Sequence, residues 1–337
     1  MNIAIDAMGG DHAPQAVLDG LVLALKALAP TTALMLYGDQ ALLRAGLTER
    51  GIQDARVSLV HTSEVVGYDE SPTLAIRQKK DSSLVRAITD VAENKADCVL
   101  SAGSTGALLT GATLLIRRQK GVKRPALATL LPTEQDEGRV LLLDCGANTD
   151  CKPAYLVQFG LMAAAYMEHV AGVKDPRIGL LSNGAEAGKG NELTKAAYAL
   201  LQDAPIHFVG NCEARDALSG EFDAVVADGF DGNVLLKGLE GAAGLMMGLL
   251  KNNMLASLRS KIGAMLAKPA LRSLKRKMDY TEYGGAPLLG VNGGVIKAHG
   301  SSNAKAFCSA MLQCEKLVAS GVVGIVGEAV QAMALED

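Results

Sequence analysis

The residues best suited by type to do chemistry lie between Asp279 and Phe307, where the chain reads DYTEYGGAPLLGVNGGVIKAHGSSNAKAF. Glycine-bearing turns surround short apolar runs, and Lys297 and His299 follow just before a predicted helix. Glycine lets the backbone approach a ligand closely, and a helix start offers unpaired N–H groups that can hold an anion. A lysine and a histidine beside such groups indicate chemistry on a phosphate-like or carbonyl-like group. The same spacing is also typical of a tight β-hairpin followed by an N-capped helix.

The turn AGSTGAL at Ala102–Leu108 is a second candidate for anion binding. It follows a predicted strand and opens a helix, so its backbone N–H groups and two hydroxyls could hold a phosphate. It is not a GxGxxG fingerprint, and no suitable acidic residue follows about 20 positions later, which disfavours a dinucleotide. A plain strand-to-helix turn has the same pattern. The residues concerned are Gly103, Ser104, Thr105 and Gly106.

A third loop, LLSNGAEAGKGN at Leu180–Asn191, superficially resembles a phosphate-binding P-loop. Three residues instead of four separate Gly184 from Gly188, and Gly190 replaces the Ser or Thr that would bind magnesium, so ATP hydrolysis is disfavoured. Asn183 and Lys189 at the predicted helix start still suit an anion. Alternatively, Lys189 is only a solvated surface lysine.

Two further strand-end loops carry carboxylates and amides. LDCGANTDCKPAYLVQ includes Asn148, and VVADGFDGNVLLKGLE includes Asp228 and Asn233. Asp228 could orient a catalytic group, or it could be only a cap or turn residue, which is the common role of Asp before Gly. Cys145 and Cys151 lie too far apart, without a partnering Cys/His pair, to predict zinc.

Short apolar runs alternate with helical patterns along most of the chain. The runs predicted as strands are Asn2–Asp6, Ala33–Tyr37, Val57–His61, Ala96–Ser101, Ala126–Leu131, Val140–Asp144, Arg177–Ser182, Ile206–Gly210 and Ala224–Asp228. Helices are predicted at Ala13–Leu28, Ser104–Arg117, Pro153–His169 and Asn191–Leu201. This alternation predicts a mainly parallel sheet with helices on both faces, whose ligands bind at the carboxyl ends of the strands. Without a repeat or linker, residues 1–337 are expected to form a single α/β domain, with two closely joined lobes as the alternative.

The segment Gly241–Met278 contains no Asp or Glu but eight cationic residues, a formal charge of +8. Apolar residues at helical spacing predict a basic amphipathic helix pair, interrupted near Pro269. Such an insertion could lie on an anionic membrane or dock an acidic partner; alternatively, it covers the core or a dimer interface. The residues expected to bind are Met254, Leu258, Arg259, Lys261, Ile262 and Met265.

Composition excludes several classes of protein. The chain has 337 residues, 49% of them hydrophobic, and a net charge of −3, so it is not a nucleic-acid binder by bulk electrostatics. Aromatic residues are 4% with no Trp, which disfavours base-stacking surfaces. The N-terminus lacks a secretory pattern, and no run of about 18 uninterrupted apolar residues predicts a membrane span. The six cysteines form no CxxC pair, which favours free thiols in the cytoplasm.

As an ordered set, the motifs resemble the PlsX-type phosphate acyltransferases of bacterial phospholipid synthesis. The resemblance covers Asn2 to about Ser320 and rests on MGGDHAP, AGSTGAL, LLDCGANTDC, the E-x-x-K-G of Glu186–Gly190, DGFDGNVLLK and GGxxLLGVNGGVIKAHGSSNAKAF. Ala214 in GNCEARD departs from the expected glycine, which leaves that loop's conformation in doubt.

The resemblance implies a three-layer α/β/α sandwich related to phosphotransacetylases and the isocitrate dehydrogenase group. It also implies transfer of a fatty acyl group from acyl carrier protein to inorganic phosphate, giving acyl phosphate for phospholipid synthesis. The family's typical form is a homodimer without metal or nucleotide cofactor. We expect a cytoplasmic enzyme held peripherally at the inner face of the membrane. The rivals are a phosphotransacetylase acting on an acyl-CoA and a non-catalytic scaffold at the membrane surface.

Roles are carried onto matching positions as hypotheses. The predicted catalytic residues are Lys189, His299, Asp228 and Asn233, and the predicted phosphate-binding residues are Gly103, Ser104, Thr105, Gly106, Asn148, Asn183, Lys297, Ser301 and Asn303. The mechanism requires these loops to converge at one edge of the sheet. Replacing Lys189 or His299 by Ala should then lower turnover at least about tenfold, the scale of one lost transition-state contact.

Overall fold

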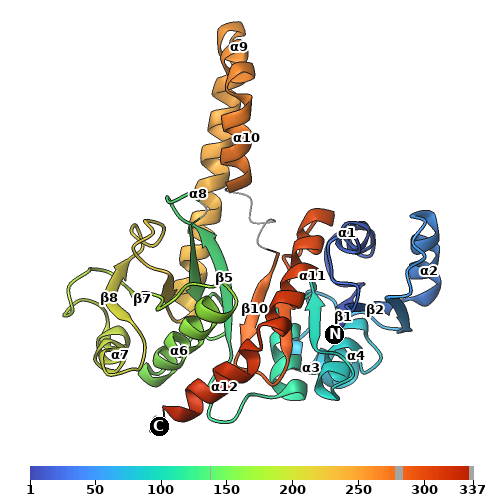
Figure 1. Ribbon diagram of the computed structural model, residues 1–337, viewed down its shortest axis with the longest axis horizontal. Coiled ribbons are helices and arrows are strands. Elements are labelled where there is room, and N and C mark those ends of the chain that lie inside the picture. The colour runs from blue at the N-terminus through green and yellow to red at the C-terminus, as the bar shows by residue number, and fades with distance from the viewer. Residues whose placement is uncertain (137, 278–283, 334–337) are drawn as a thin grey trace.

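The computed structural model describes residues 1–136, 138–277 and 284–333, and Figure 1 shows how their elements are arranged. The strands are β1 (Asn2–Asp6), β2 (Ala33–Gly38), β3 (Val57–His61), β4 (Cys98–Ser101), β5 (Ala126–Pro132), β6 (Arg139–Leu143), β7 (Ile178–Ser182), β8 (Phe208–Glu213), β9 (Ala224–Val226), β10 (Ala286–Leu289) and β11 (Gly294–Lys297). The helices are α1 (Gln15–Ala24), α2 (Gln40–Glu49), α3 (Pro72–Gln78), α4 (Ser83–Ala92), α5 (Thr105–Gly111) with the π-helical continuation η1 (Ala112–Ile116), α6 (Pro153–His169), α7 (Glu192–Gln202), α8 (Gly229–Leu255), α9 (Leu258–Leu266), α10 (Lys268–Lys277), α11 (Ala304–Ala319) and α12 (Val322–Ala332).

These strands form one 11-stranded sheet in the order β3-β2-β1-β4-β11-β10-β5-β6-β9-β7-β8. Most neighbours are parallel, but β10 is antiparallel to β11 and β5, and β5 is antiparallel to β6. The group β1–β4–β11 therefore runs in one direction and the group β6–β9–β7 in the other. Their carboxyl ends consequently lie at opposite edges of the sheet, which decides where each loop can contribute.

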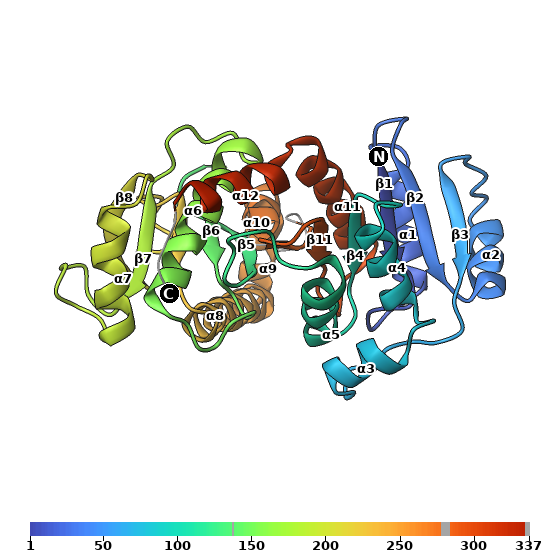
Figure 2. The ribbon, with the colours of Figure 1, turned by 90° about the horizontal axis from the view of Figure 1, so that it is seen from below.

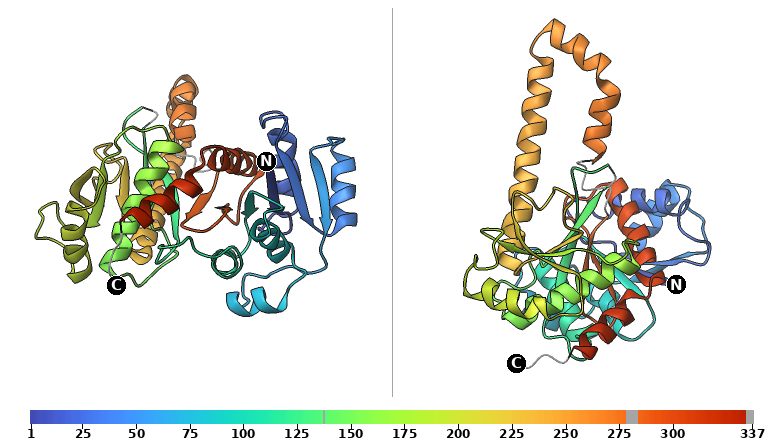
Figure 3. Two further views of the ribbon diagram at one scale, coloured as in Figure 1. Left: turned by 60° about the horizontal axis from the view of Figure 1, so that its bottom comes forward. Right: turned by 60° about the vertical axis from the view of Figure 1, so that its left-hand side comes forward.

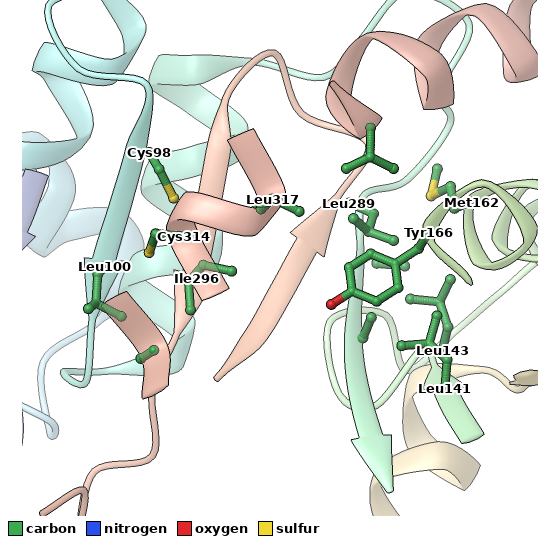
Figure 4. Close-up of a cluster of buried hydrophobic side chains, with 14 of the residues drawn as sticks. Cys98, Leu100, Leu141, Leu143, Met162, Tyr166, Leu289, Ile296, Cys314 and Leu317 are labelled. Carbon is green, nitrogen blue, oxygen red and sulfur yellow. The ribbon is translucent and has the colours of Figure 1, made fainter. Parts of the chain in front are cut away.

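Helices cover both faces of the sheet, which confirms the predicted three-layer α/β class (Figure 2). Alternate strand residues point to opposite faces, so Ile3 and Ile5 join one buried cluster and Ala4 the other. The first cluster packs beneath α1, α6 and α11, and Figure 4 shows part of it around Tyr166 and Ile296. The second packs against α4 and α5, with the base of α8 beside it.

The sequence places most strands to within two residues of their observed bounds. β1, β3 and α6 match their predictions at both ends. The segment following residue 283 forms the antiparallel hairpin β10–β11 and then α11. Its backbone therefore follows the alternative of a tight β-hairpin and an N-capped helix. Residues 279–283 lie outside the described residues. Both hairpin strands join the main sheet, with β11 beside β4 and β10 beside β5. The hairpin therefore connects the two halves of the sheet.

A helical hairpin, defined here as the part of α8 from Gly241 onward with α9 and α10, projects from the body (Figures 1 and 3). The helix pair predicted for Gly241–Met278 is realised as three helices, because α8 starts earlier, at Gly229, and the chain breaks at Ser257 and Ala267. Ser257 and Ser260 form a capping box for α9. The interruption expected near Pro269 is found at Ala267, and Pro269 itself lies in the first turn of α10, where proline is tolerated. Met278 lies outside the described residues.

The helical hairpin presents large apolar side chains to solvent. Leu258 is 76% exposed, Ile262 50% and Met265 66%. Within the described ranges, α8 is long and apolar enough to cross a membrane by length and composition, and the bent pair α11–α12 would also qualify if counted as one span. Soluble core helices pass the same test, and α11 buries one side of its length in the core.

Candidate active site

Three polar side chains form a row across adjacent parallel strands. The register pairs Lys297 of β11 with Ser101 of β4, and it places Asp6 of β1 at the same level. Neighbouring strands lie about 4.8 Å apart, and equivalent positions point to the same face. Asp6, Ser101 and Lys297 therefore meet at one edge of the sheet, on the face that α4 and α5 cover.

The Asp6 carboxylate is fully enclosed by donors. It is 2% exposed and accepts hydrogen bonds from Ser83 Oγ (2.6 Å) and Ser101 Oγ (2.7 Å), and from the backbone N–H of Met8 (3.4 Å). Burial raises the pKa of Asp6 above its usual value, and these hydrogen bonds act in the opposite direction. Ser101 Oγ also accepts the N–H of Gly103 (3.0 Å), so its own proton is directed to Asp6.

The loop after β1 packs directly on the loop after β4. A Cβ added at Gly9 would lie 2.4 Å from Asp6 Oδ2 and 2.8 Å from the Gly103 nitrogen, so only glycine fits. Gly10 has a φ of +117°, and Asp11 donates its N–H to Gly300 O (2.9 Å). The loops that follow β1, β4 and β11 thus form one connected structure.

Lys297 brings a buried positive charge to this structure. It is 8% exposed, and its Nζ donates to Ala298 O and to Ala102 O (3.4 Å). Tyr68 Oη donates to the same Ala102 carbonyl (3.2 Å). Burial lowers the pKa of Lys297 to about 8, while the nearby Asp6 and Asp11 carboxylates act in the opposite direction. Lys297 therefore keeps its charge at neutral pH and loses it in mildly alkaline solution.

His299 lies two residues beyond Lys297, on the exposed side of the loop. Its Nδ1 accepts the N–H of Ser301 (3.2 Å) and lies 2.8 Å from Ser301 Oγ. Partial burial lowers the pKa of His299, and the positive charge of Lys237 lowers it further. The imidazole is therefore neutral at pH 7, and because Nδ1 accepts a hydrogen bond, the ring proton is on Nε2. A neutral Nε2–H group can donate a hydrogen bond to a developing oxyanion.

The base of α8 contributes charge to the same region. Lys237 and Glu240 form an ion pair of 2.7 Å. Both affect the pKa of His299 and also that of Cys145, so they lie within electrostatic range of each. α8 therefore carries Lys237 from its start beside β9 toward the Lys297 edge.

Several predicted phosphate-binding residues in this region cap a helix or form its first turn. Ser104 Oγ caps α5 by accepting the N–H of Ala107 (3.4 Å), and Asn303 Oδ1 caps α11 by accepting that of Ala306 (3.0 Å). Thr105 and Gly106 form the first turn of α5, and Gly106 lies against Pro72. Gly103, Ser104, Thr105 and Gly106 thus accompany Lys297, His299, Ser301 and Asn303 at one edge of the sheet.

Asp228, Asn233 and Asn148 form a second group, which surrounds the buried Asp144. Asp144 is 0% exposed and accepts the Asn148 amide (2.9 Å) and the N–H of Leu127 (2.9 Å). Asp228 caps α8 through the N–H groups of Phe230 (2.9 Å) and Asp231 (2.8 Å), as its structural alternative predicts. Asn233, in the second turn of α8, lies beside Gly146 of the loop that contains Asp144 and Asn148.

Lys189 and Asn183 belong to the loop between β7 and α7. This loop packs on itself and on β8: Asn211 donates to Glu186 O (2.9 Å), and Gly184 lies against the Lys189 stem. Asn191 caps α7 by accepting the N–H of Thr194 (2.9 Å). The end of β7 lies beside that of β9, so this loop belongs with the Asp228 group.

The expectation that the loops converge at one edge of the sheet is wrong. β6, β9 and β7 run antiparallel to β1, β4 and β11, so Asn148, Asp228, Asn233, Asn183 and Lys189 follow carboxyl ends at the opposite edge from Lys297 and His299. The sequence pattern shows that each loop follows a strand, but it does not give the direction of that strand in the sheet. The proposed roles of the second group remain predictions.

Cys145 and Cys151, the two cysteines of the Asp144 loop, are protonated thiols. Cys145 donates to Leu127 O (3.1 Å) and lies 3.0 Å from Thr129 Oγ1, and burial raises its pKa to about 12. Burial also raises the pKa of Cys151 to about 12. Thiols in this state are not thiolates at neutral pH. Within the described residues, no group of three or more His, Cys, Asp or Glu side chains could hold a metal ion.

A cavity of about 460 Å³ lies away from both groups, on the opposite face of the sheet. It opens between α6 and α11, with Leu130, Tyr166 and Leu312 among its lining residues, and it contains none of the predicted site residues. Its position gives it no direct part in chemistry at Lys297.

Residue-by-residue analysis of the sequence missed several members of the site. Ser101 is a common residue without a motif, and Tyr68 comes from a loop with no predicted role. Asp6 lies in the strand-end loop DAMGGDHAP and could have been found, because an acid that ends an apolar strand must be hydrogen-bonded if it is buried.

Comparison with known proteins identifies the family of the chain. The family model described as fatty acid synthesis protein matches residues 1–324. The phosphate acyltransferase of Exiguobacterium sibiricum is 50% identical over 98% of both chains, and that of Bacillus cereus is 46% identical over the whole of both. Among solved structures, a phosphotransacetylase from Streptococcus pyogenes has a TM-score of 0.60 at 18% identity, covering 99% of this chain and 94% of that one. A branched-chain phosphotransacylase from Enterococcus faecalis also scores 0.60, at 17% identity, covering 94% and 99%.

The two solved structures are too distant in sequence to show more than the fold, which they share with this chain over nearly its full length. The curated relatives are close enough to show the family and confirm the resemblance to PlsX-type enzymes. The chain therefore belongs to the fatty acid synthesis protein family of phosphate acyltransferases, and it is an enzyme that transfers an acyl group to phosphate.

Proposed function

We propose that the acyl donor is a fatty acyl thioester of acyl carrier protein and that the acyl phosphate product feeds phospholipid synthesis. Inorganic phosphate attacks the thioester carbonyl, the carbon–sulfur bond breaks, and the carrier leaves as a thiol. The proton lost by hydrogen phosphate is the one that the thiol gains, so the step balances without a cofactor. The enzyme must hold the dianion against the carbonyl and stabilise the oxyanion that forms.

The observation that carries the phosphate site is the buried ammonium of Lys297 at the junction of three loops. Its charge is held by carbonyl oxygens and by the nearby carboxylates, and a phosphate dianion would add a stronger partner. In the part of the chain that the structure describes, the Ser302 hydroxyl is 1% exposed and has no hydrogen-bond partner. Leaving such a group unpaired is costly, so its loop is better satisfied with a polar ligand bound.

His299 is suited to the oxyanion or to the leaving sulfur. Its neutral imidazole carries the proton on Nε2, so it can donate to the carbonyl oxygen as negative charge develops there. It can alternatively pass a proton to the departing thiolate. Direct transfer is favoured over an acyl-enzyme, because burial keeps the Cys145 and Cys151 thiols protonated.

The decisive experiment compares two donors at equal concentration. Purified enzyme is mixed with phosphate and either an acyl carrier protein thioester or the matching acyl-CoA, and acyl phosphate is trapped with hydroxylamine. We expect hydroxamate from the carrier thioester at a rate at least about tenfold above that from acyl-CoA. Equal or faster reaction with acyl-CoA would favour the phosphotransacetylase alternative, whose fold this chain shares. No hydroxamate from either donor would favour the non-catalytic scaffold.

The helical hairpin supports a peripheral place on the inner face of the cytoplasmic membrane. It combines exposed Leu258, Ile262 and Met265 with a segment that carries a formal +8, which suits an anionic lipid surface. Met254, Arg259 and Lys261 complete the proposed contact. The same cations could receive an acidic carrier protein, and a homodimer is proposed from the family resemblance alone. Residues 1–337 are proposed to act as one domain, with residues 241–278 as its insertion.

A further inference from the structure

Asp6 is connected to Lys297 by three hydrogen bonds and one peptide group that joins them. Its carboxylate accepts from Ser101 Oγ (2.7 Å), and Ser101 Oγ accepts from the N–H of Gly103 (3.0 Å). That N–H belongs to the peptide group whose carbonyl is Ala102 O, and Ala102 O accepts from Lys297 Nζ (3.4 Å). The path thus leads from one strand end, through the next, to the ammonium on the third.

The same carboxylate fixes the loop after β1. The N–H of Met8 reaches it at 3.4 Å, and the Gly9 backbone packs against both Asp6 and Gly103. Ser83 also donates to Asp6 (2.6 Å), but it comes from α4 and lies off the path to Lys297. Ser83 and Ser101 therefore both donate to the Asp6 carboxylate, but only Ser101 is connected to the Lys297 ammonium.

We propose that Asp6 is a positioning residue, which acts through Ser101, Gly103 and Ala102 to fix the Lys297 ammonium where phosphate binds. The inference rests on the proposed function, because it takes Lys297 as the phosphate partner. Buried as it is, Asp6 does not touch phosphate itself. Its charge also faces Lys297, together with Asp11 from the β1–α1 loop, while Lys237 of α8 acts in the opposite direction.

The test measures binding of inorganic phosphate alone to the full-length protein by titration calorimetry, with no acyl donor present. Asp6→Asn keeps the shape but loses the charge and puts an N–H group among donors. We expect its dissociation constant for phosphate to rise about tenfold or more, the scale of weakening one charge-assisted contact. Ser101→Ala should weaken binding in the same direction, and the double variant no more than Asp6→Asn, because both act along one path.

Ser83→Ala is the matched control, since it removes a hydrogen bond to the same carboxylate without interrupting the path. We expect its phosphate affinity to stay within about twofold of wild type. A second readout separates positioning from general damage. Without the Asp6 charge, the pH above which phosphate affinity falls should shift downward, because Lys297 loses a carboxylate that favours its protonated form.

The proposal is overturned if folded Asp6→Asn binds phosphate as wild type does, or if Ser83→Ala loses as much affinity as Ser101→Ala. Should Asp6→Asn fail to fold, Ser101→Ala against Ser83→Ala still decides the question. If the wild-type protein itself bound no phosphate, the proposed phosphate site would fall, and this inference with it. Wild-type binding combined with unchanged variants would remove only the role of Asp6.

Discussion

At the scale of single residues, the charge on Lys297 controls the affinity of the proposed site for phosphate. Burial lowers the pKa of Lys297 to about 8, so the ammonium is protonated at pH 7 and becomes neutral as the pH rises through that value. With phosphate concentration expressed as the dianion, we therefore expect its KM to rise by about tenfold for each unit of pH above 8, with little change below 7. Steady-state kinetics at saturating acyl donor would measure it.

Lys297→Arg is the control for this pH dependence. A guanidinium keeps its charge throughout the range, so the variant should show a KM for phosphate that stays level with pH, whatever its absolute value. An alkaline rise of equal size in both proteins would mean that another group titrates.

His299 and Lys189 were predicted alike from the sequence, yet they follow strands that point to opposite edges of the sheet. We expect His299→Ala to lower kcat at least about tenfold, because it removes a donor to the oxyanion. We expect Lys189→Ala to leave the KM for phosphate within about twofold, because the loop after β7 lies at the other edge. Both are measured with the hydroxylamine assay, and circular dichroism establishes that each variant is folded. A large rise in KM for phosphate in Lys189→Ala would return that lysine to the phosphate site.

At the scale of elements, the contact between the loops after β1 and β4 allows no side chain at position 9. A Cβ on Gly9 would lie 2.4 Å from Asp6 Oδ2, so Gly9→Ala must displace the carboxylate or the loop. We expect it to destabilise the protein by about 1–3 kcal/mol and to weaken phosphate binding. Chemical denaturation and calorimetry would measure the two effects.

Gly324→Ala in α12 is the matched control, because an added Cβ there meets open space. It should stabilise the protein by about 0.5–1 kcal/mol through the helix preference of alanine, with unchanged phosphate binding. If Gly9→Ala behaved in the same way, the two loops would not be in the close contact described.

The elements also show what the sequence could and could not predict. Local patterns were sufficient for β1, β3 and α6, because buried strands and helices have strong periodicity. They predicted that Lys297 and His299 precede a capped helix. They could not show that three successive antiparallel pairings, β11–β10, β10–β5 and β5–β6, reverse the direction of the sheet, because strand pairing joins residues distant in the chain. The strand-end position of Asp6 was visible in the sequence, but its role was not, since two of its partners, Ser83 and Ser101, come from α4 and β4.

At the scale of the whole molecule, reversal of the sheet gives two polar edges with different surroundings. One edge gathers Lys297 and His299, and the other gathers Asp144, Asp228 and the Lys189 loop. α8 connects them: it begins at the Asp228 cap, brings Lys237 within electrostatic range of His299, and continues into the helical hairpin. The hairpin is therefore an extension of an element that reaches the proposed reaction site. A contact made far out on it can set how the body of the enzyme is presented to its substrates.

This arrangement predicts that membrane attachment and chemistry are separable. Leu258 and Ile262 lie on α9, are 76% and 50% exposed, and should enter the lipid interface. Leu258→Glu with Ile262→Glu should lower co-sedimentation with vesicles containing anionic lipid at least about tenfold, because each lost apolar contact costs about 1.5–3 kcal/mol. Acyl phosphate formation from soluble donor should be unchanged, since neither residue lies near Lys297.

Leu23→Glu with Leu42→Glu is the matched control, because these two leucines are each 43% exposed on α1 and α2, in the body of the protein. This variant adds the same charge away from the hairpin and should sediment with vesicles as wild type does. Persistence of vesicle binding in the α9 variant would show that the membrane role is wrong. If the α9 variant alone lost activity with soluble acyl carrier thioester, the helical hairpin would instead bind the carrier protein. Only a contact between α9 and the acyl donor would make turnover depend on those two side chains.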